Sequence, residues 1–264
     1  MNETDPNSVP VRPASTAIIL RDGAAGMDVF MVVRHHQIDF ASGAFVFPGG
    51  KVDPQDEEYV RDNNFGVSES GPNSSYWIAA IRETFEEAGL VLARKRNEGD
   101  IVDANEAHRL VVEHRADILD GKLTFPDLLK MNDLRPALEL MVPFAHWITP
   151  STQPKRFDTH FFLVAAPVRQ TGAHDGTEAV EGVWTTPKQA LADADAGRRI
   201  MLPPTRLNLE KLAQDDRVED AVARARSSKV VTVLPRVEKV DGGRKLHLPI
   251  EAGYGISELF VKAK

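Results

Sequence analysis

The stretch from Arg82 to Leu90 reads RETFEEAGL and carries three glutamates, Glu83, Glu86 and Glu87. In a helix that turns about 100° per residue, the three carboxylates share an arc of about 100°. The opposite side of the same helix is apolar and contains Ile78, Ile81, Phe85 and Ala88. The pattern predicts a helix over 76–88, followed by a glycine cap, that buries one face and concentrates negative charge on the other.

Clustered carboxylates destabilise a helix and raise one another's pKa unless a cation lies among them. The chain contains no Cys, so thiolate ligands are excluded and oxygen or imidazole ligands remain. Carboxylates suit a hard cation, Mg²⁺ or Mn²⁺, which keeps water and substrate phosphate oxygens in its coordination shell. The pattern therefore predicts phosphate chemistry, and a solvated acidic helix face is the alternative.

Upstream, an expected short strand over 44–47 is followed by Pro48 and two glycines, which let the backbone approach another group closely. Gly50 and the RETFEEAGL helix together resemble the Nudix hydrolase signature, which is a glycine, five residues, an acid, seven residues and R-E-aliphatic-x-E-E-x-G-aliphatic. Asp56 stands where the signature has glutamate, and Thr84 replaces an aliphatic residue. The gap from Asp56 to the arginine is 25 residues instead of seven, which leaves open whether Asp56 takes the glutamate's place.

This long insertion, with FVFPGGKVD before it and WITPSTQPKRFDTHFF after it, is similar to the Nudix branch that includes the peroxisomal coenzyme A diphosphatases. The resemblance implies a Nudix-type α/β/α sandwich with a mixed curved sheet. It implies that Glu86 and Glu87 bind the metal, with the backbone carbonyl of Gly50 as a further ligand. Glu83 is then either a third ligand or the base that deprotonates water, and Arg82 orients the carboxylates.

Further candidates surround this motif. Basic residues beside a metal site can bind the substrate's phosphates, although a solvated or structural role is equally compatible with the sequence. The basic candidates are Lys155, Arg156, Arg34 and His160. Glu178 and Glu181 occupy a loop from which many Nudix enzymes recruit another acid, and the sequence leaves open whether either joins the site.

The rest of the chain predicts mixed α/β structure without the strand–helix alternation of a parallel doubly wound sheet. The expected strands cover 14–20, 27–33, 44–47, 161–166, 182–185, 229–234 and 245–249. The expected helices, besides 76–88, cover 103–119, 125–130, 188–196, 205–214 and 217–226. The polar stretch from Lys51 to Ser75 is expected to be mostly loop.

These elements suggest one domain with additions. We expect a flexible N-terminal arm over 1–13 and a Nudix hydrolase domain over 14–202. Helical insertions are expected at about 57–75 and 93–140. Residues 203–264 form a C-terminal extension that packs on the same domain, caps the pocket or mediates a homodimer, and the sequence does not separate these three alternatives.

The amino-acid composition limits the classes of partner that we expect the protein to bind. The 264 residues include 32 Lys and Arg against 39 Asp and Glu, a formal net charge of −7, which disfavours binding to a nucleic-acid backbone. No stretch reaches the roughly 18 apolar residues of a membrane span. We therefore expect a cytoplasmic protein that binds a small-molecule diphosphate substrate, without nucleic acid or membrane.

The leading functional hypothesis is a metal-dependent hydrolase of a nucleoside-diphosphate-linked substrate, coenzyme A or acyl-coenzyme A, with Mg²⁺ or Mn²⁺ and attack by water on the diphosphate. ADP-ribose, nucleotide sugars and dinucleotides remain alternative substrates because the acidic helix handles only the diphosphate. A non-catalytic ligand-binding or regulatory module is an alternative of another class. The complete acidic set argues against it, since a ligand sensor does not need all of these residues.

Overall fold

A computed structural model describes residues 9–34, 43–63, 73–97, 99–172 and 179–262. The strands of the central sheet are β1 Val11–Gly23, β2 Gly26–Arg34, β3 Phe45–Val46, β4 Gly49–Lys51, β7 Met141–Ile148, β8 Arg156–Ala165, β9 Ala179–Thr185 and β10 Thr232–Val233. Their order is β10-β7-β8-β1-β2-β3, with β4 paired to β1 and β9 paired to β2. Because β1 and β8 run parallel while β1 and β2 run antiparallel, the sheet is mixed.

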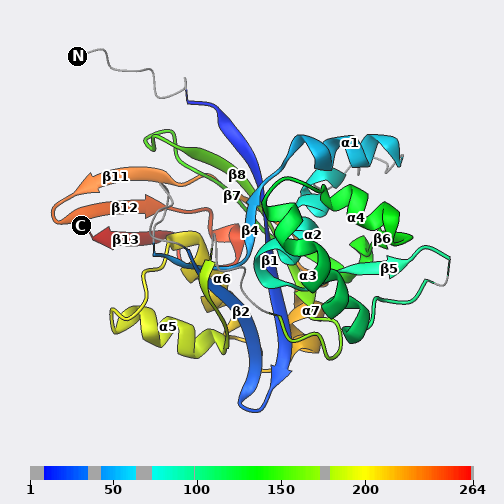
Figure 1. Cartoon of the computed structure of the whole chain (residues 1–264). Coiled ribbons are helices and arrows are strands. Elements are labelled where there is room, and N and C mark those ends of the chain that lie inside the picture. The colour runs from blue at the N-terminus through cyan, green and yellow to red at the C-terminus, as the bar shows by residue number, and fades with distance from the viewer. Residues whose placement is uncertain (1–8, 35–42, 64–72, 98, 173–178, 263–264) are drawn as a thin grey trace.

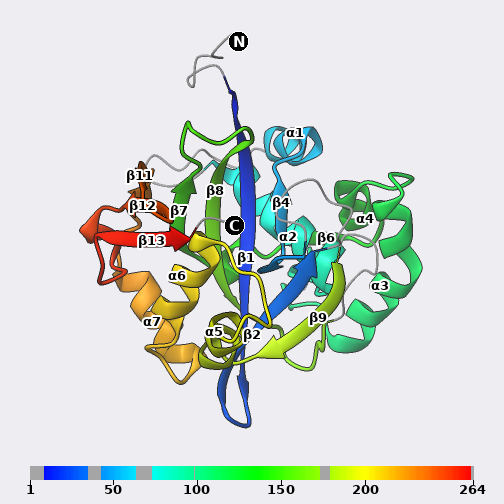
Figure 2. The same cartoon turned by 90° about the vertical axis from the view of Figure 1, so that its left-hand side faces the viewer.

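Helices cover both faces of this sheet. On one side lie α2 Ser74–Ala88, α3 Ala104–Leu119 and α4 Phe125–Met131, and on the other lie α5 Pro187–Asp195, α6 Pro203–Leu212 and α7 Val218–Ser227 (Figure 2). Successive residues of β1 point to opposite faces. Ala17 and Ile19 enter the core beneath α2, whereas Ile18 and Leu20 enter the core beneath α6 and α7. This arrangement confirms the expected α/β/α sandwich.

Strand β1 brings the functional segments together. Its residues Val11–Leu20 pair with β8 along one edge. On the other edge, Ala14–Thr16 pair with β4, and Leu20–Gly23 pair with β2. The two glycines of the expected motif therefore lie against the middle of the sheet, directly beside α2 (Figure 1).

The C-terminal residues build on the same core. After α6 and α7, strands β11 Arg236–Val240, β12 Gly243–His247 and β13 Glu258–Lys262 form a separate three-stranded antiparallel sheet. Leu207 of α6, Ala221 of α7 and Leu246 of β12 belong to the buried cluster that contains Ile18 of β1. The described part of the extension is thus packed on the central sheet.

The expected loop over 51–75 contains a helix. Helix α1 spans Pro54–Asp62, with proline at its first position and Asp53 as its N-cap. The Asp53 side chain accepts a hydrogen bond from the backbone, and the Asp56 side chain at the third position accepts one from the backbone N–H of Asp53, which is a capping box. The apolar pattern did not reveal α1 because Tyr59 is its only buried apolar residue. Residues 64–72 of this insertion lie outside the described part of the chain.

Several other expected boundaries also change. Strand β1 begins at Val11, which pairs with Arg156, so the expected arm over 1–13 ends earlier. Strand β7 was not expected, and β8 begins at Arg156 instead of Phe161. The two-stranded sheet of β5 Ala93–Lys95 and β6 Leu134–Pro136 was not expected either. Such short or partly polar strands show too little alternation to be found without their pairing partners.

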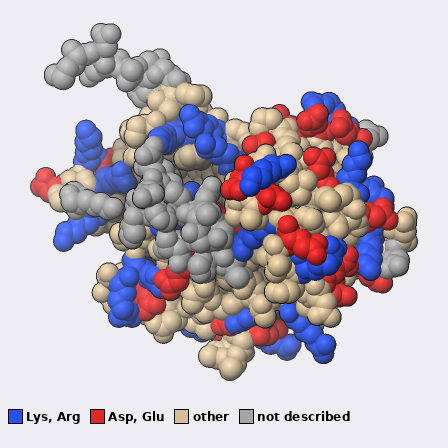
Figure 3. All heavy atoms as spheres, in the orientation of Figure 1, with Lys and Arg blue, Asp and Glu red and all other residues tan. Residues whose placement is uncertain are grey.

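The described surface mixes both charges. On the face shown in Figure 3, acidic and basic side chains are interspersed among neutral ones. Within the described ranges, none of the helices combines the length and the apolar character that a membrane crossing requires.

Candidate active site

Helix α2 presents the acidic residues as the sequence predicted, with a start at Ser74 instead of Tyr76. Asn73 is its N-cap and accepts a hydrogen bond from the backbone N–H of Ser75 at 3.3 Å. The expected glycine cap is Gly89, which adopts the left-handed conformation with φ of 62°. The apolar side of α2 is fully buried in the core, which fixes the direction of the opposite, acidic side.

Thr84, the residue of α2 that departs from the Nudix signature, forms its hydrogen bond within the helix. Thr84 is fully buried. Its hydroxyl donates to the backbone carbonyl of Ala80, one turn earlier, at 2.7 Å. A threonine at this position therefore leaves no unpaired donor in the core, and the departure does not disturb the acidic side.

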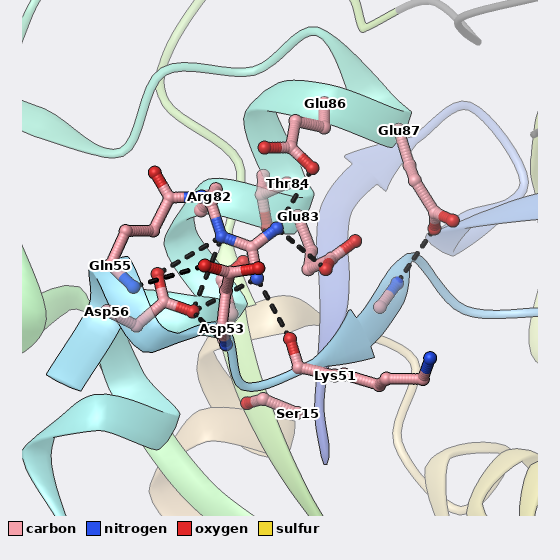
Figure 4. Close-up of polar contacts among 12 residues, drawn as sticks. Ser15, Lys51, Asp53, Gln55, Asp56, Arg82, Glu83, Thr84, Glu86 and Glu87 are labelled. Atoms are coloured by element: carbon pink, nitrogen blue, oxygen red, sulfur yellow. Dashed lines mark hydrogen bonds and ion pairs between the residues drawn. The ribbon is translucent and has the colours of Figure 1, made fainter. Parts of the chain in front are cut away.

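Arg82 organises the acidic side (Figure 4). Its Nη1 donates to Glu83 Oε1 and to Glu86 Oε2, both at 2.9 Å, and its Nη2 donates to the carbonyl of Lys51 at 2.9 Å. Burial alone lowers the pKa of Arg82, but the charges of Glu83, Asp56 and Glu86 outweigh burial and raise it above the ordinary arginine value. The guanidinium is therefore permanently charged and contacts the carboxylates of Glu83 and Glu86 directly.

Asp56 follows Gly50 after five intervening residues, where the signature has its first acid. Its Oδ2 accepts from Arg82 Nη2 at 3.0 Å and its Oδ1 accepts from Arg82 Nε at 3.1 Å, a two-point contact between a planar guanidinium and a carboxylate. The Asp56 side chain is fully buried. Burial raises the pKa of Asp56, and the guanidinium of Arg82 opposes that rise. The 18 residues inserted between Asp56 and Arg82 do not separate this pair. Helix α1, which begins directly after β4, places Asp56 beside Arg82.

The paired glycines allow β4 to lie against both β1 and α2. A Cβ atom on Gly49 would lie 2.5 Å from the carbonyl oxygen of Ser15. A Cβ atom on Gly50 would lie 2.3 Å from Oε1 of Glu83. The backbone N–H of Gly49 donates to Glu87 Oε2 at 2.8 Å, so β4 positions Glu87 directly. The glycines are needed for close approach of the backbone, as the sequence suggested.

The acidic cluster forms part of the wall of a cavity of about 520 Å³. Glu83 and Glu86 line it together with Arg82. Four further basic residues also line it: Arg12 of β1, Arg34 at the end of β2, Lys51 of β4 and Lys155 from the turn between β7 and β8. Carboxylates and cations in one cavity suit a hard metal ion together with the phosphate oxygens that it binds. The Nε atom of Arg34 is buried and has no hydrogen-bond partner among the described residues.

Other sequence candidates lie elsewhere. Arg156 donates to the carbonyls of Thr149 at 3.1 Å and Val9 at 3.3 Å and does not line the acidic cavity. Glu181 forms a two-point contact with Arg199 at 2.7 and 2.8 Å, also outside the cavity lining. Glu178 lies outside the described residues. Arg12 was not predicted to belong to the site, because it lay in the segment expected to be a flexible arm. The structure shows that β1 begins at Val11 and therefore includes Arg12.

His160 also lies away from the acidic cavity, in a cluster on the face of the sheet that α2 covers. Its ring stacks on that of His146 of β7 with a centroid distance of 3.9 Å, and it contacts Tyr76 of α2 at 4.5 Å. His146 also forms a hydrogen bond with Asp158. Burial, and then the proximity of His146, lowers the pKa of His160 to about 4. His160 is not among the residues that line the acidic cavity.

Comparison with known proteins agrees with this geometry. A family model described as the NUDT19 Nudix domain matches residues 60–212, more than half of the chain. The chain belongs to this Nudix family. The resemblance found in the RETFEEAGL helix and the long insertion is thereby confirmed.

Relatives of this Nudix chain include acyl-coenzyme A diphosphatase NUDT19 of Xenopus laevis, which is 24% identical over 232 residues, 73% of this chain and 61% of that protein. Acyl-coenzyme A diphosphatase NUDT19 of Homo sapiens is 27% identical over 158 residues, 57% of this chain and 41% of that protein. This chain therefore spans less than two thirds of either relative's length. A crystal structure of a Nudix hydrolase from Alicyclobacillus acidocaldarius superposes with a TM-score of 0.65 and 27% identity, and the match covers 82% of this chain and 97% of that one.

Proposed function

We propose that this Nudix protein hydrolyses the diphosphate of coenzyme A or acyl-coenzyme A in a metal-dependent reaction. The observation that carries the proposal is the cluster around Arg82, which holds Glu83 and Glu86 at the wall of a cavity that also contains Arg34 and Lys155. Acidic and basic groups in this combination fit a diphosphate with its metal ion. The printed names of the relatives support the coenzyme A class of substrate.

The residues present fit a hard divalent cation. The three carboxylates of Asp56, Glu83 and Glu86 outnumber the guanidinium of Arg82 that they contact, and a fourth, that of Glu87 on the same helix as Glu83 and Glu86, accepts from the backbone of Gly49. All their donor atoms are oxygens, which suit Mg²⁺ or Mn²⁺. Glu83, Glu86 and Glu87 would hold the ion, with the backbone carbonyl of Gly50 as a further ligand. The Asp56 carboxylate is occupied by Arg82 and by the backbone N–H of Asp53, and it would orient this set without touching the ion.

Hydrolysis then needs water, a base and neutralisation of charge. Water attacks one phosphorus, a P–O bond of the anhydride breaks, and its electron pair goes to the departing phosphate. The metal, when bound, neutralises developing negative charge and lowers the pKa of water. A carboxylate of the acidic set takes the proton from water, and these coupled carboxylates titrate as a unit. Arg34 and Lys155 bind the phosphate oxygens. Cleavage of the anhydride of coenzyme A, or of its acyl form, gives 4′-phosphopantetheine, or its acyl form, and adenosine 3′,5′-bisphosphate.

The direct test incubates the purified chain with Mg²⁺ or Mn²⁺ and separates the products by mass spectrometry. The panel contains coenzyme A, acyl-coenzyme A, ADP-ribose, nucleotide sugars and dinucleotides. We expect cleavage of the coenzyme A compounds at the diphosphate. Preferred cleavage of another member would reassign the substrate within the same chemistry, and cleavage of none would favour a ligand-binding module.

The Glu86→Gln variant tests the acidic set. Because the substitution removes a charge that stabilises the transition state through the metal, we expect turnover to fall by at least about 100-fold. Binding of Mn²⁺, measured by electron paramagnetic resonance, should weaken in parallel. Glu219→Gln, at an exposed glutamate of α7, is the matched control and should retain both properties. Full turnover in Glu86→Gln would contradict the proposed mechanism.

A further inference from the structure

We propose that an apolar cavity beside the acidic one holds the acyl chain of acyl-coenzyme A, so that the C-terminal extension sets the chain-length preference. This inference rests on the proposed diphosphatase function and adds a specificity site to it. The cavity has a volume of about 260 Å³. It lies on the face of the sheet that carries α6, whereas α2 covers the opposite face.

The two cavities are adjacent and share part of their walls. Both are lined by Gly49 of β4, Thr16 of β1, Phe157 and Thr159 of β8, and Arg34 of β2. Arg34 lies at the boundary, with its Nε buried and unpartnered among the described residues. With the diphosphate at the acidic wall, the pantetheine arm that links it to the thioester would have to cross this shared boundary for the acyl chain to reach the apolar cavity.

The walls of this cavity come from two parts of the chain. The central sheet contributes the aromatic residues Phe47, Trp147 and Phe161, and the C-terminal extension contributes Pro203–Thr205, Pro235, Val237 and Leu246. Side chains from α6, β11 and β12 thus close a space that the sheet alone would leave open. The extension is therefore part of the binding site.

The chemistry of the lining favours a hydrocarbon occupant over a base that needs hydrogen bonds. Most of the exposed lining is apolar, although Gln153 and Arg244 also contribute to it. The indole N–H of Trp147 donates to the hydroxyl of Tyr254 at 2.9 Å, and that hydroxyl donates to Asn208 at 2.8 Å. This chain of hydrogen bonds uses the polar atom of Trp147, so the ring offers the cavity an apolar surface.

Burial of hydrocarbon gives a measurable expectation. Each fully buried methylene strengthens binding by about three- to fourfold. With Mg²⁺ present, kcat/KM should therefore rise by roughly two- to fourfold per methylene from acetyl-coenzyme A through butanoyl- and hexanoyl-coenzyme A, and level off when the cavity is full. Free coenzyme A, measured in parallel, is the reference for the diphosphatase itself.

The variant Val237→Phe tests whether the extension forms the wall. The larger ring should occupy the cavity and lower the ratio of kcat/KM for hexanoyl-coenzyme A to that for free coenzyme A by at least about fivefold. Leu234→Phe is the matched control, because Leu234 lies three residues away on the same extension, is 52% exposed and does not line the cavity. The ratio should be unchanged in this control. Circular dichroism and the thermal midpoint establish that both variants fold.

The outcomes separate the two proposals. If free coenzyme A is cleaved but the chain-length series is flat, or Val237→Phe leaves the ratio unchanged, the acyl pocket is rejected and the diphosphatase stands. An equal loss for free and acylated substrate in Val237→Phe also rejects the acyl assignment, because the cavity would then hold a part common to both. If no coenzyme A compound is cleaved, the proposed function itself fails.

Discussion

At the scale of single residues, the site depends on a buried guanidinium. Arg82 is only 5% exposed and contacts Asp56, Glu83 and Glu86 together with the carbonyl of Lys51. A buried charge is costly unless partners surround it, and here the partners include residues that we propose to bind metal. The same ion pairs therefore contribute both to the stability of the fold and to the proposed function.

We predict that Asp56→Asn destabilises the protein by about 3 kcal/mol. The substitution keeps the size of the side chain but leaves part of the buried charge of Arg82 uncompensated. Urea unfolding at neutral pH measures the free energy of unfolding. Asp62→Asn, an exposed position on the same helix α1, is the matched control and should change stability by less than about 0.5 kcal/mol. Equal stability of the two variants would show that the pair with Arg82 contributes little.

At the scale of elements, the site forms where β4 lies against α2. The backbone of Gly49 binds Glu87, and Gly50 leaves room for the carboxylate of Glu83. Neither contact belongs to α2 or β4 alone. The glycines are thus required by the packing of a strand against a helix.

The Gly50→Ala variant should lose activity while it keeps its fold. The new methyl group would meet Glu83 Oε1 at 2.3 Å, and the carboxylate would have to move out of its contact with Arg82. Because a side chain moves and the backbone does not, we expect turnover to fall about tenfold or more with a thermal midpoint close to that of the wild type. A crystal structure of the variant would show a displaced Glu83 carboxylate. Unchanged turnover would show that the position of Glu83 is not critical.

At the scale of the whole molecule, the two faces of the sheet have different roles. One face, beneath α6 and the extension, carries the apolar cavity. The other face carries the stack of His146 and His160, close to Asp158 of β8 and Tyr76 of α2. This histidine cluster contributes to the packing of α2 on the sheet.

We predict that His160 lowers stability in mild acid. Its folded-state pKa is about 4 against an ordinary value of 6.5, because burial and His146 disfavour the charged form more than Asp158 favours it. Between these two values the unfolded chain binds a proton that the folded protein does not, so stability falls as pH decreases. The loss from pH 7 to pH 5 should be about 2 kcal/mol.

Urea unfolding of the wild type and of His160→Gln at both pH values isolates this contribution. The variant has no titrating group at the position and should lose less stability between pH 7 and pH 5 than the wild type. Acidic residues elsewhere titrate in both proteins, so the difference between the two losses is the quantity that matters. Identical losses would contradict the lowered pKa.

The local sequence was sufficient for the acidic helix and the family. Ile78, Ile81 and Phe85 recur at helical spacing, so the burial of one side and the acidic character of the other follow from the order of residues. The glycine cap of α2, Gly89, could likewise be predicted, since a cap depends on residues within one turn.

Contacts between distant segments required the folded chain. Asp56 meets Arg82 because α1 folds back onto α2, and Arg34 joins both cavities because β2 ends beside β4. Arg156 and Glu181 had the right charge but are held by other groups. Local order specifies which face of a helix is acidic, whereas pairing between strands far apart in the chain determines which charges share a cavity, because those contacts form only when the sheet assembles.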